Sequence, residues 1–134
     1  MPASITVFVV DRDKSFLRAM ARLMDAVGFR AVCVSSIEDL FHEDLASSQD
    51  VLLVDVSTAR QFGDSLHEQL QARGLGMPVI YLTDCETDRM RRKLRSQGAA
   101  GYFRKPVDQQ ALVDAITFAT QQPNGTEAGR EARH

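Results

Sequence analysis

The sequence lacks most of the features that would assign a protein class from composition alone. No apolar run approaches the roughly 20 residues that a membrane-spanning helix needs, and the first residues lack the pattern of a secretory signal peptide. Only two cysteines are present, Cys33 and Cys85, and their spacing matches no metal site, so we expect free thiols in a cytoplasmic protein. The formal net charge of -2 gives no reason to expect nonspecific binding to nucleic acid or to a membrane surface.

What remains is the composition of an ordinary globular domain, with 44% hydrophobic and 25% charged residues in a chain of 134 residues. This length suffices for one hydrophobic core. The apolar periodicity stops after about residue 121, so we expect one domain over residues 1–121 and a polar tail or linker over residues 122–134. The histidines, His42, His67 and His134, form no ligand pattern and are expected at the surface.

Short apolar runs alternate with amphipathic stretches along the chain. Continuous apolar runs are typical of strands covered on both faces, and they predict strands at residues 5–10, 31–34, 51–56, 78–83 and 101–104. The amphipathic stretches predict helices at residues 13–27, 35–45, 62–73, 87–97 and 108–120. Strands that alternate with helices in this way indicate an α/β fold, in which helices cover both faces of a parallel sheet.

Capping signals mark the ends of several predicted helices. Asp13 can cap the first helix, and Gly28 suits the left-handed position that follows it. Ser35 starts a capping box for the second helix, and Asp108 can cap the last one. On that last helix, Phe118 is expected among the apolar positions that face the core.

Polar residues stand at the carboxyl ends of four predicted strands: Asp11, Arg12, Asp13, Asp55, Thr83, Asp84 and Lys105. Ligands of open parallel sheets bind beyond this edge, at the switch point of the strand order. A single aspartate there would be an ordinary turn residue. Carboxylates, a hydroxyl and an amine that converge on one edge predict a functional site.

Residues 4–120 resemble the receiver domain of bacterial response regulators. The motif GAAGYFRKP, the lone aspartate at the end of the third strand and the dipeptide LT at the end of the fourth all fall at that family's spacing. The resemblance implies a doubly wound, CheY-like fold with five parallel strands in the order 2-1-3-4-5. It is greatest to the FixJ-like branch, and it implies two-component signal transduction rather than an enzyme activity.

The resemblance also assigns roles to individual residues. Asp55 would accept a phosphoryl group from a histidine kinase or a phosphotransfer protein, and an aspartate carboxylate is able to attack phosphorus. Thr83 would donate a hydrogen bond to that group, and Lys105 would pair with one of its oxygens. Tyr102 would be the aromatic switch, and the peptide bond between Lys105 and Pro106 would be cis.

The pocket departs from the family pattern where Mg²⁺ would bind. The implied ligands are Asp11, Asp55 and the carbonyl of Ser57, but Arg12 replaces the second acid that touches the metal. Asp84 stands where a small residue is usual. The pocket has therefore lost a ligand and one unit of negative charge, so we expect a weak or absent Mg²⁺ site.

Arg12 has three interpretations. It pairs with Asp55 or Asp84 as a permanent counter-ion, or it turns to solvent and leaves a weakened but phosphorylatable site, or it contacts a partner. A further change follows Asp55, where Thr58 and Ala59 replace the usual Met-Pro. A pseudo-receiver that binds other proteins without being phosphorylated also remains an alternative.

A phosphohydrolase of the haloacid dehalogenase type is a rival hypothesis. Asp11 would be its nucleophile and Asp13 its acid and base, with Thr83 and Lys105 matching later motifs. The chain is short for that family, and the hypothesis leaves Asp55 unused.

Basic residues crowd the predicted fourth helix and the neighbouring strand: Arg89, Arg91, Arg92, Lys93, Arg95 and Arg104. They form either a solvated face or a surface that attracts an acidic partner. In receivers, the face of the fourth helix, fifth strand and fifth helix pairs with outputs or with a second copy. The resemblance thus allows a homodimer and a DNA-binding output domain outside this chain, without direct nucleic acid binding by this domain.

Overall fold

The computed structural model describes residues 5–45, 50–62, 66–85 and 87–121. These residues form one five-stranded parallel sheet in the order β2-β1-β3-β4-β5, as predicted. The strands are β1 (Thr6–Val10), β2 (Arg30–Val34), β3 (Asp50–Asp55), β4 (Val79–Thr83) and β5 (Gly101–Arg104). The helices are α1 (Lys14–Ala26), α2 (Ile37–Leu40), α3 (Val56–Phe62), α4 (Leu66–Ala72), α5 (Asp88–Ser96) and α6 (Gln109–Gln121).

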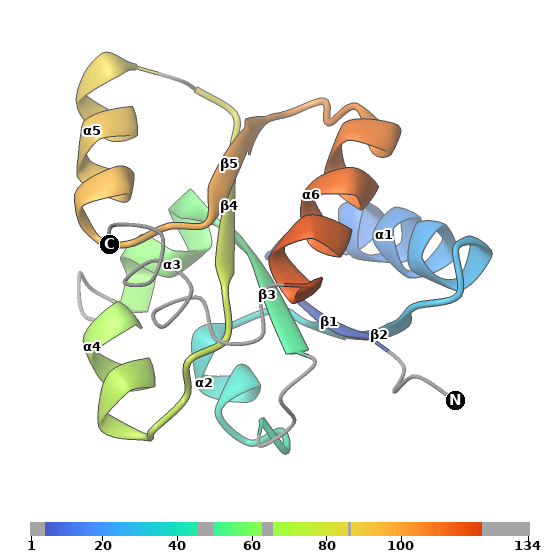
Figure 1. Cartoon of the computed structure of the whole chain (residues 1–134), viewed down its shortest axis with the longest axis horizontal. Helices are drawn as coiled ribbons and strands as arrows, with labels where there is room; N and C mark the ends of the chain where they lie inside the picture. Colours follow the sequence, from blue (N-terminus) through green and yellow to red (C-terminus); the bar gives the residue numbers. More distant parts are fainter. Residues whose placement is uncertain (1–4, 46–49, 63–65, 86, 122–134) are drawn as a thin grey trace.

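Helices cover both faces of the sheet. Figure 1 shows α1 and α6 together on one face, with α3, α4 and α5 on the other. Successive strand residues point to opposite faces, so Val7 and Val9 lie in the cluster with α1 and α6. Phe8 and Val10 lie in the cluster on the other face. Burial of both faces explains why the strands are continuous apolar runs.

The strand register aligns the carboxyl ends of the strands at one edge of the sheet. Val10 of β1 pairs with Val54 of β3, so that Asp55 comes one residue beyond the end of β1. Asp55 in turn pairs with Leu82, next to Thr83 at the end of β4. The register therefore brings the polar residues that follow these strands to one place.

Local signals located several helix ends correctly. The Asp13 carboxylate caps α1 by accepting hydrogen bonds from the amides two and three residues further on, and the Thr87 hydroxyl caps α5 by accepting one from the Met90 amide. Gly28 and Gly98 follow these two helices in the left-handed region, with φ of 86° and 88°. The last helix begins one residue after Asp108, as predicted.

The helix predicted over residues 62–73 is confirmed in part by α4, over Leu66–Ala72, and its residues 63–65 lie outside the described residues. The helix α3 was not predicted, and it begins at Val56, directly after Asp55. Its first turn is capped by the Asp55 carboxylate, whose Oδ2 accepts a hydrogen bond from the Thr58 amide at 2.9 Å. Val56 continues the apolar run of β3 in the sequence, and this hid the start of the helix.

The second helix is also shorter than predicted. It covers only Ile37–Leu40, and its cap is Ser36 rather than Ser35. The Ser36 hydroxyl accepts a hydrogen bond from the Asp39 amide at 3.0 Å, so Ser36 instead of Ser35 supplies the acceptor for the first turn of the helix. Leu45 is buried although it lies beyond the helix.

Phe118 does not face the core, contrary to the prediction. Its side chain is 65% exposed, whereas Leu112 and Ile116 of the same helix are fully buried. Leu112 and Ile116 are four residues apart and share one face, but Phe118 lies two residues further, about 200° around the helix axis.

His67 is half-buried rather than at the surface, and burial lowers the pKa of its imidazole. Its ring lies 5.8 Å from the ring of Tyr81, between centroids, and burial raises the pKa of Tyr81 to about 12. His42 is exposed, as expected. His134 and the predicted tail over residues 122–134 lie outside the described residues.

Both cysteines are free thiols, as predicted. Cys85 is exposed, whereas Cys33 is partly buried, and this burial raises the pKa of its thiol. Within the described ranges, no helix has the length and apolar character needed to cross a membrane.

Candidate functional site

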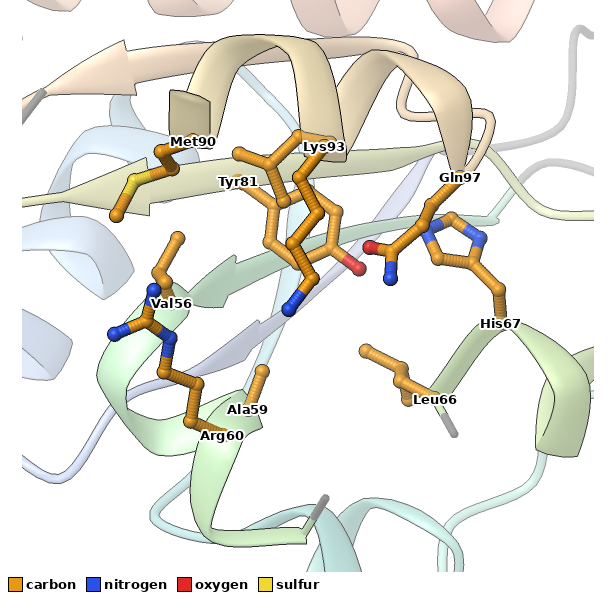
Figure 2. Close-up of a pocket in the computed structure, with 10 residues that line it drawn as sticks. Val56, Ala59, Arg60, Leu66, His67, Tyr81, Met90, Lys93 and Gln97 are labelled. Atoms are coloured by element: carbon orange, nitrogen blue, oxygen red, sulfur yellow. The ribbon is translucent and has the colours of Figure 1, made fainter. Parts of the chain in front are cut away.

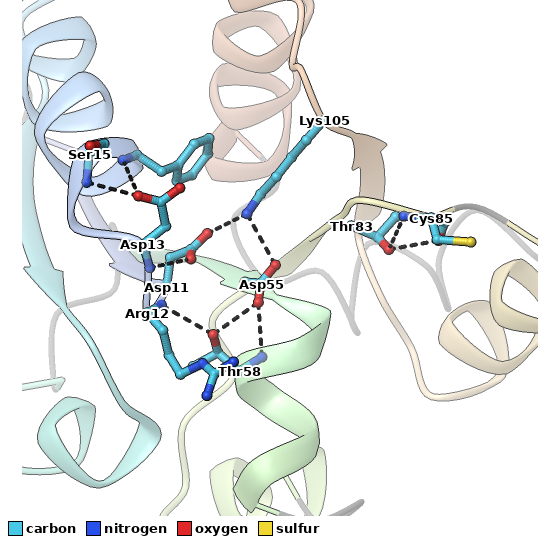
Figure 3. A network of polar contacts seen from close by, with 10 residues as sticks. Asp11, Arg12, Asp13, Ser15, Asp55, Thr58, Thr83, Cys85 and Lys105 are labelled. Carbon is cyan, nitrogen blue, oxygen red and sulfur yellow. Dashed lines mark hydrogen bonds and ion pairs between the residues drawn. The ribbon is translucent and has the colours of Figure 1, made fainter.

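The predicted site residues gather at the carboxyl edge of the sheet. Asp11 follows β1, Asp55 ends β3, Thr83 ends β4 and Lys105 follows β5. Asp11, Asp55 and Thr83 are buried, with relative exposures of 3%, 6% and 4%. Buried polar groups need partners, and Figure 3 shows the hydrogen bonds that supply them.

Lys105 joins the two buried carboxylates. Its Nζ lies 2.5 Å from Asp11 Oδ2 and 3.1 Å from Asp55 Oδ1, and 4.4 Å from the ring centroid of Phe16. Burial alone would lower the pKa of Lys105, but the hydrogen bonds and charges of Asp11 and Asp55 outweigh it, so the pKa is raised. The ammonium group is therefore a fixed positive charge between two carboxylates. The peptide bond between Lys105 and Pro106 is cis, as the resemblance implied.

Thr58 is a site residue to which the sequence analysis assigned no role. Its backbone amide and its hydroxyl both donate to Asp55 Oδ2, each at 2.9 Å. The same hydroxyl accepts a hydrogen bond from the Arg12 amide at 3.2 Å. Thr58 is only 2% exposed. A hydroxyl in place of the family's methionine was the available signal, but its target depends on α3 starting at Val56.

Asp13 caps α1 instead of joining the site. Its Oδ1 accepts from the Ser15 amide at 2.9 Å and from the Phe16 amide at 3.3 Å. The Asp13 amide itself donates to Asp11 Oδ1 at 2.9 Å, which fixes the loop after β1. This geometry does not favour the phosphohydrolase hypothesis, because that mechanism needs Asp13 as the acid and base and Asp11 as a free nucleophile.

Arg12 does not form the predicted counter-ion pair. Its side chain is exposed, and the described part of the chain offers it no ion pair with Asp55 or Asp84. Asp84 is exposed as well, so its carboxylate is solvated rather than part of a buried pocket. Lys105 and Thr58 already donate hydrogen bonds to both oxygens of Asp55, so this carboxylate is partnered without the guanidinium. Of the three interpretations of Arg12, the structure therefore agrees with the second, in which the side chain turns to solvent.

Thr83 and Tyr102 make contacts away from Asp55 in this state. The Thr83 hydroxyl donates to the Cys85 carbonyl at 2.7 Å and accepts from the Cys85 amide at 3.1 Å. The Tyr102 hydroxyl accepts a hydrogen bond from Arg91 Nε, and the Tyr102 ring is partly exposed. The backbone of the loop after β4 is thus the hydrogen-bond partner of the Thr83 hydroxyl, which the resemblance assigns to a phosphoryl group.

The predicted basic surface lies on α5 and β5. Its members are exposed except for Arg91, which is partly buried: Arg89, Arg91, Arg92, Lys93, Arg95 and Arg104. Arg91 Nη1 also lies 3.9 Å from the Asp88 carboxylate, so part of the positive charge is compensated within the helix. The remaining cations face solvent.

A cavity of about 40 Å³ lies between α3, α4, β4 and α5. Figure 2 shows His67 and Tyr81 at its wall, with Arg60 and Lys93 also lining it. Its volume would hold a few water molecules at most. Asp55 does not line the cavity, but its neighbour in the sequence, Val56, does.

Residues 7–117 match the response regulator receiver domain. The chain belongs to this family. Among curated relatives, the receiver is 27% identical over 114 residues to the transcriptional regulatory protein TdiR of Thauera aromatica, covering 85% of this chain and 50% of that protein. It is 27% identical over 116 residues to the transcriptional regulatory protein FixJ of Azorhizobium caulinodans, covering 87% of this chain and 55% of FixJ. The chain thus spans about half the length of the curated relatives it matches.

Solved structures have the same fold. The response regulator StyR superimposes with a TM-score of 0.79 at 30% identity, covering 98% of this chain and 66% of StyR. FixJ-N superimposes with a TM-score of 0.78 at 21% identity, covering 90% of this chain and 97% of FixJ-N. The CheY-like fold and the strand order 2-1-3-4-5 are therefore confirmed.

Receiver domains generally bind Mg²⁺ in the phosphorylation site, and the expected ligands here are Asp11, Asp55 and the Ser57 carbonyl. Both oxygens of each carboxylate already accept hydrogen bonds, chiefly from Lys105 and Thr58. No group of three His, Cys, Asp or Glu side chains is placed to hold a metal ion in the ranges that the structure describes. These residues do not fit Mg²⁺ unless the hydrogen bonds rearrange.

Proposed function

We propose that this receiver is phosphorylated at Asp55 by a histidine kinase or a phosphotransfer protein, in a pocket with a weak or absent Mg²⁺ site. The observation that carries the proposal is the Asp55 carboxylate itself. It is 6% exposed, stands at the end of β3, and has Lys105 Nζ 3.1 Å from Oδ1. A nucleophile needs such a fixed cation nearby to stabilise the negative charge of the transferring group.

The reaction is the transfer of a phosphoryl group between two proteins. An oxygen of Asp55 forms a bond to phosphorus while the bond from phosphorus to the donor's histidine nitrogen breaks, and the electron pair of that bond returns to the imidazole. Asp55 Oδ1 is the better placed oxygen, because it accepts one hydrogen bond whereas Oδ2 accepts two. The Lys105 ammonium group then pairs with the oxygens of the bound phosphoryl group instead of the carboxylate.

Phosphorylation would change the partners of Thr83. Its hydroxyl now bonds to the backbone of Cys85, and a phosphoryl group on Asp55 offers it a charged acceptor. Rotation of the hydroxyl toward that group would release the loop after β4. Tyr102, now held by Arg91 at the surface, is the side chain that would respond to this movement.

The test is phosphorylation by acetyl phosphate, with and without MgCl₂, followed by intact mass and peptide mapping. Wild type should gain one phosphoryl group, and the Asp55→Asn variant should gain none. Asp84→Asn is the matched control, because Asp84 is an exposed acid near the same edge that should not affect labelling. Labelling of Asp55→Asn at the wild-type level would refute the proposal.

An interaction module that is never phosphorylated is the second candidate. The hydrogen bonds on both oxygens of Asp55 favour it, since they lower the reactivity of the carboxylate. In that case neither acetyl phosphate nor a kinase would label wild type, while the protein would still bind its partner.

We further propose that the basic face of α5 and β5 binds an acidic partner or a second copy of the chain. The support is the exposure of most of its cations, including Arg92 and Arg95, beside the partly exposed Tyr102. Output through a DNA-binding domain outside this chain is proposed by analogy with the longer transcriptional regulators TdiR and FixJ.

A further inference from the structure

Thr58 links the loop after β1 to the Asp55 carboxylate through a continuous hydrogen-bond chain. The Arg12 amide donates to Thr58 Oγ1 at 3.2 Å, and Thr58 Oγ1 lies 2.9 Å from Asp55 Oδ2. An ionised carboxylate can only accept, so the single hydroxyl proton points to Asp55 and a hydroxyl lone pair receives the Arg12 amide. The direction of every bond in the chain is therefore fixed.

The acceptor positions of Asp55 are almost all occupied. A carboxylate has about four lone-pair positions. The amide and the hydroxyl of Thr58 take the two on Oδ2, and Lys105 takes one on Oδ1. One position on Oδ1 remains, and both a metal ion and an incoming phosphorus atom would need it.

We infer that the Thr58 hydroxyl, rather than the Arg12 guanidinium, weakens the binding of a divalent cation at Asp55. The hydroxyl occupies the second acceptor position that a metal would otherwise take, and the buried setting of Thr58 keeps water from competing for it. A metal ion and the phosphoryl group then compete for the last acceptor position on Oδ1. This inference rests on the proposed function only in naming Asp55 as the reacting carboxylate.

The role of Arg12 changes under this inference. Its exposed guanidinium leaves the pocket without a ligand, but its backbone amide holds the Thr58 hydroxyl, and any residue except proline at this position supplies that amide. Restoring an acid at position 12 therefore returns one ligand while the hydroxyl still occupies a position on Asp55 Oδ2. The effects on Mg²⁺ affinity of restoring this acid and of removing the Thr58 hydroxyl should be coupled rather than additive.

The experiment measures the melting temperature of the whole 134-residue chain in graded MgCl₂ at constant ionic strength, without any phosphoryl donor. Metal binding to the folded state raises this temperature, and the dependence gives the dissociation constant. Thr58→Val removes the hydroxyl and keeps the branched shape, and it should bind Mg²⁺ about tenfold more tightly, equivalent to about 1.4 kcal/mol. Thr58→Ser keeps the hydroxyl and should bind like wild type.

Two results would overturn the inference: equal Mg²⁺ affinity in Thr58→Val and wild type, or an equal gain in Thr58→Ser and Thr58→Val. The Arg12→Asp variant gives an independent test if Thr58→Val does not fold. With Thr58 intact, its gain should stay well below tenfold, and a gain of about tenfold or more would show that only the missing acid limits binding. Because no phosphoryl donor is present, these outcomes are separate from the acetyl phosphate test of Asp55.

Discussion

Replacing Lys105 by methionine should destabilise the receiver through its two carboxylate partners. The ammonium lies 2.5 Å from Asp11 Oδ2 and 3.1 Å from Asp55 Oδ1, and its side chain is 14% exposed. Methionine keeps most of the apolar stem but leaves two buried carboxylates without a cation. Removal of one partner of a buried ion pair costs about 3–5 kcal/mol, and because Lys105 is partly exposed we expect a loss of about 3 kcal/mol. For a domain of this size the melting temperature should fall by about 10 °C.

The assay is urea unfolding followed by circular dichroism, because urea carries no charge and does not screen the pair. Lys14→Met on α1 is the matched control, since Lys14 is exposed and should change the unfolding free energy by less than about 0.5 kcal/mol. Adding Asp11→Asn to Lys105→Met should recover part of the loss, because only one buried carboxylate then remains. If Lys105→Met matches Lys14→Met, the ammonium group does not hold the site together.

The pH dependence gives a second check of the same reasoning. The pKa of Lys105 is raised above its ordinary value of 10.5 in the folded state, so its contribution is fully present below that value and lost as the pH rises through the folded pKa. At neutral pH the ion pairs are intact. The difference in unfolding free energy between Lys105→Met and wild type should therefore stay constant around neutral pH and shrink only when the pH rises above 10.5.

Two further predictions concern the α5 surface and His67. Arg92→Glu with Arg95→Glu should weaken association in sedimentation experiments, as should added salt, while Arg22→Glu on α1 should not; Arg91 is kept because it holds Tyr102. An unchanged association state in all variants at low and high salt would argue against a partner surface. The His67 pKa in the folded state lies below its ordinary value of 6.5. The contribution of His67 to the free energy of unfolding should therefore be fully present above that value and be lost as the pH falls through the folded pKa. His67→Phe should show a smaller loss between about pH 7 and about pH 5, and identical slopes would contradict the assignment.

The parts of the fold that depend on local chemistry were predictable from the sequence. The strands are apolar on both faces, and the caps of α1 and α5 use side chains that bond to amides two or three residues away. The start of α3 was not predictable in this way. Val56 belongs to the apolar run of β3 by composition, and its helical conformation depends on the Asp55 carboxylate turning back to cap the helix.

The site divides along the same line. The meeting of Asp11, Asp55 and Lys105 follows from parallel strands that end at one edge, so it could be predicted before any side chain was placed. The Thr58 contact could not, because it needs the position of α3. Arg12 shows the corresponding error for charges, since a formal charge in the sequence does not say whether the side chain faces the pocket or water.

Under the inference drawn for Thr58, the contrast between Arg12 and Thr58 would explain how a receiver can lack the second acid and still hold Asp55 in a fixed orientation. A guanidinium in the pocket would have required desolvation, which costs several kcal/mol unless every donor is paired. A hydroxyl is small, uncharged and already attached to the helix that Asp55 caps, so it orients the carboxylate at low desolvation cost. Lys105 supplies the positive charge that remains necessary. The loss of the second acid is therefore compatible with an intact Asp55, provided that Thr58 keeps its hydroxyl.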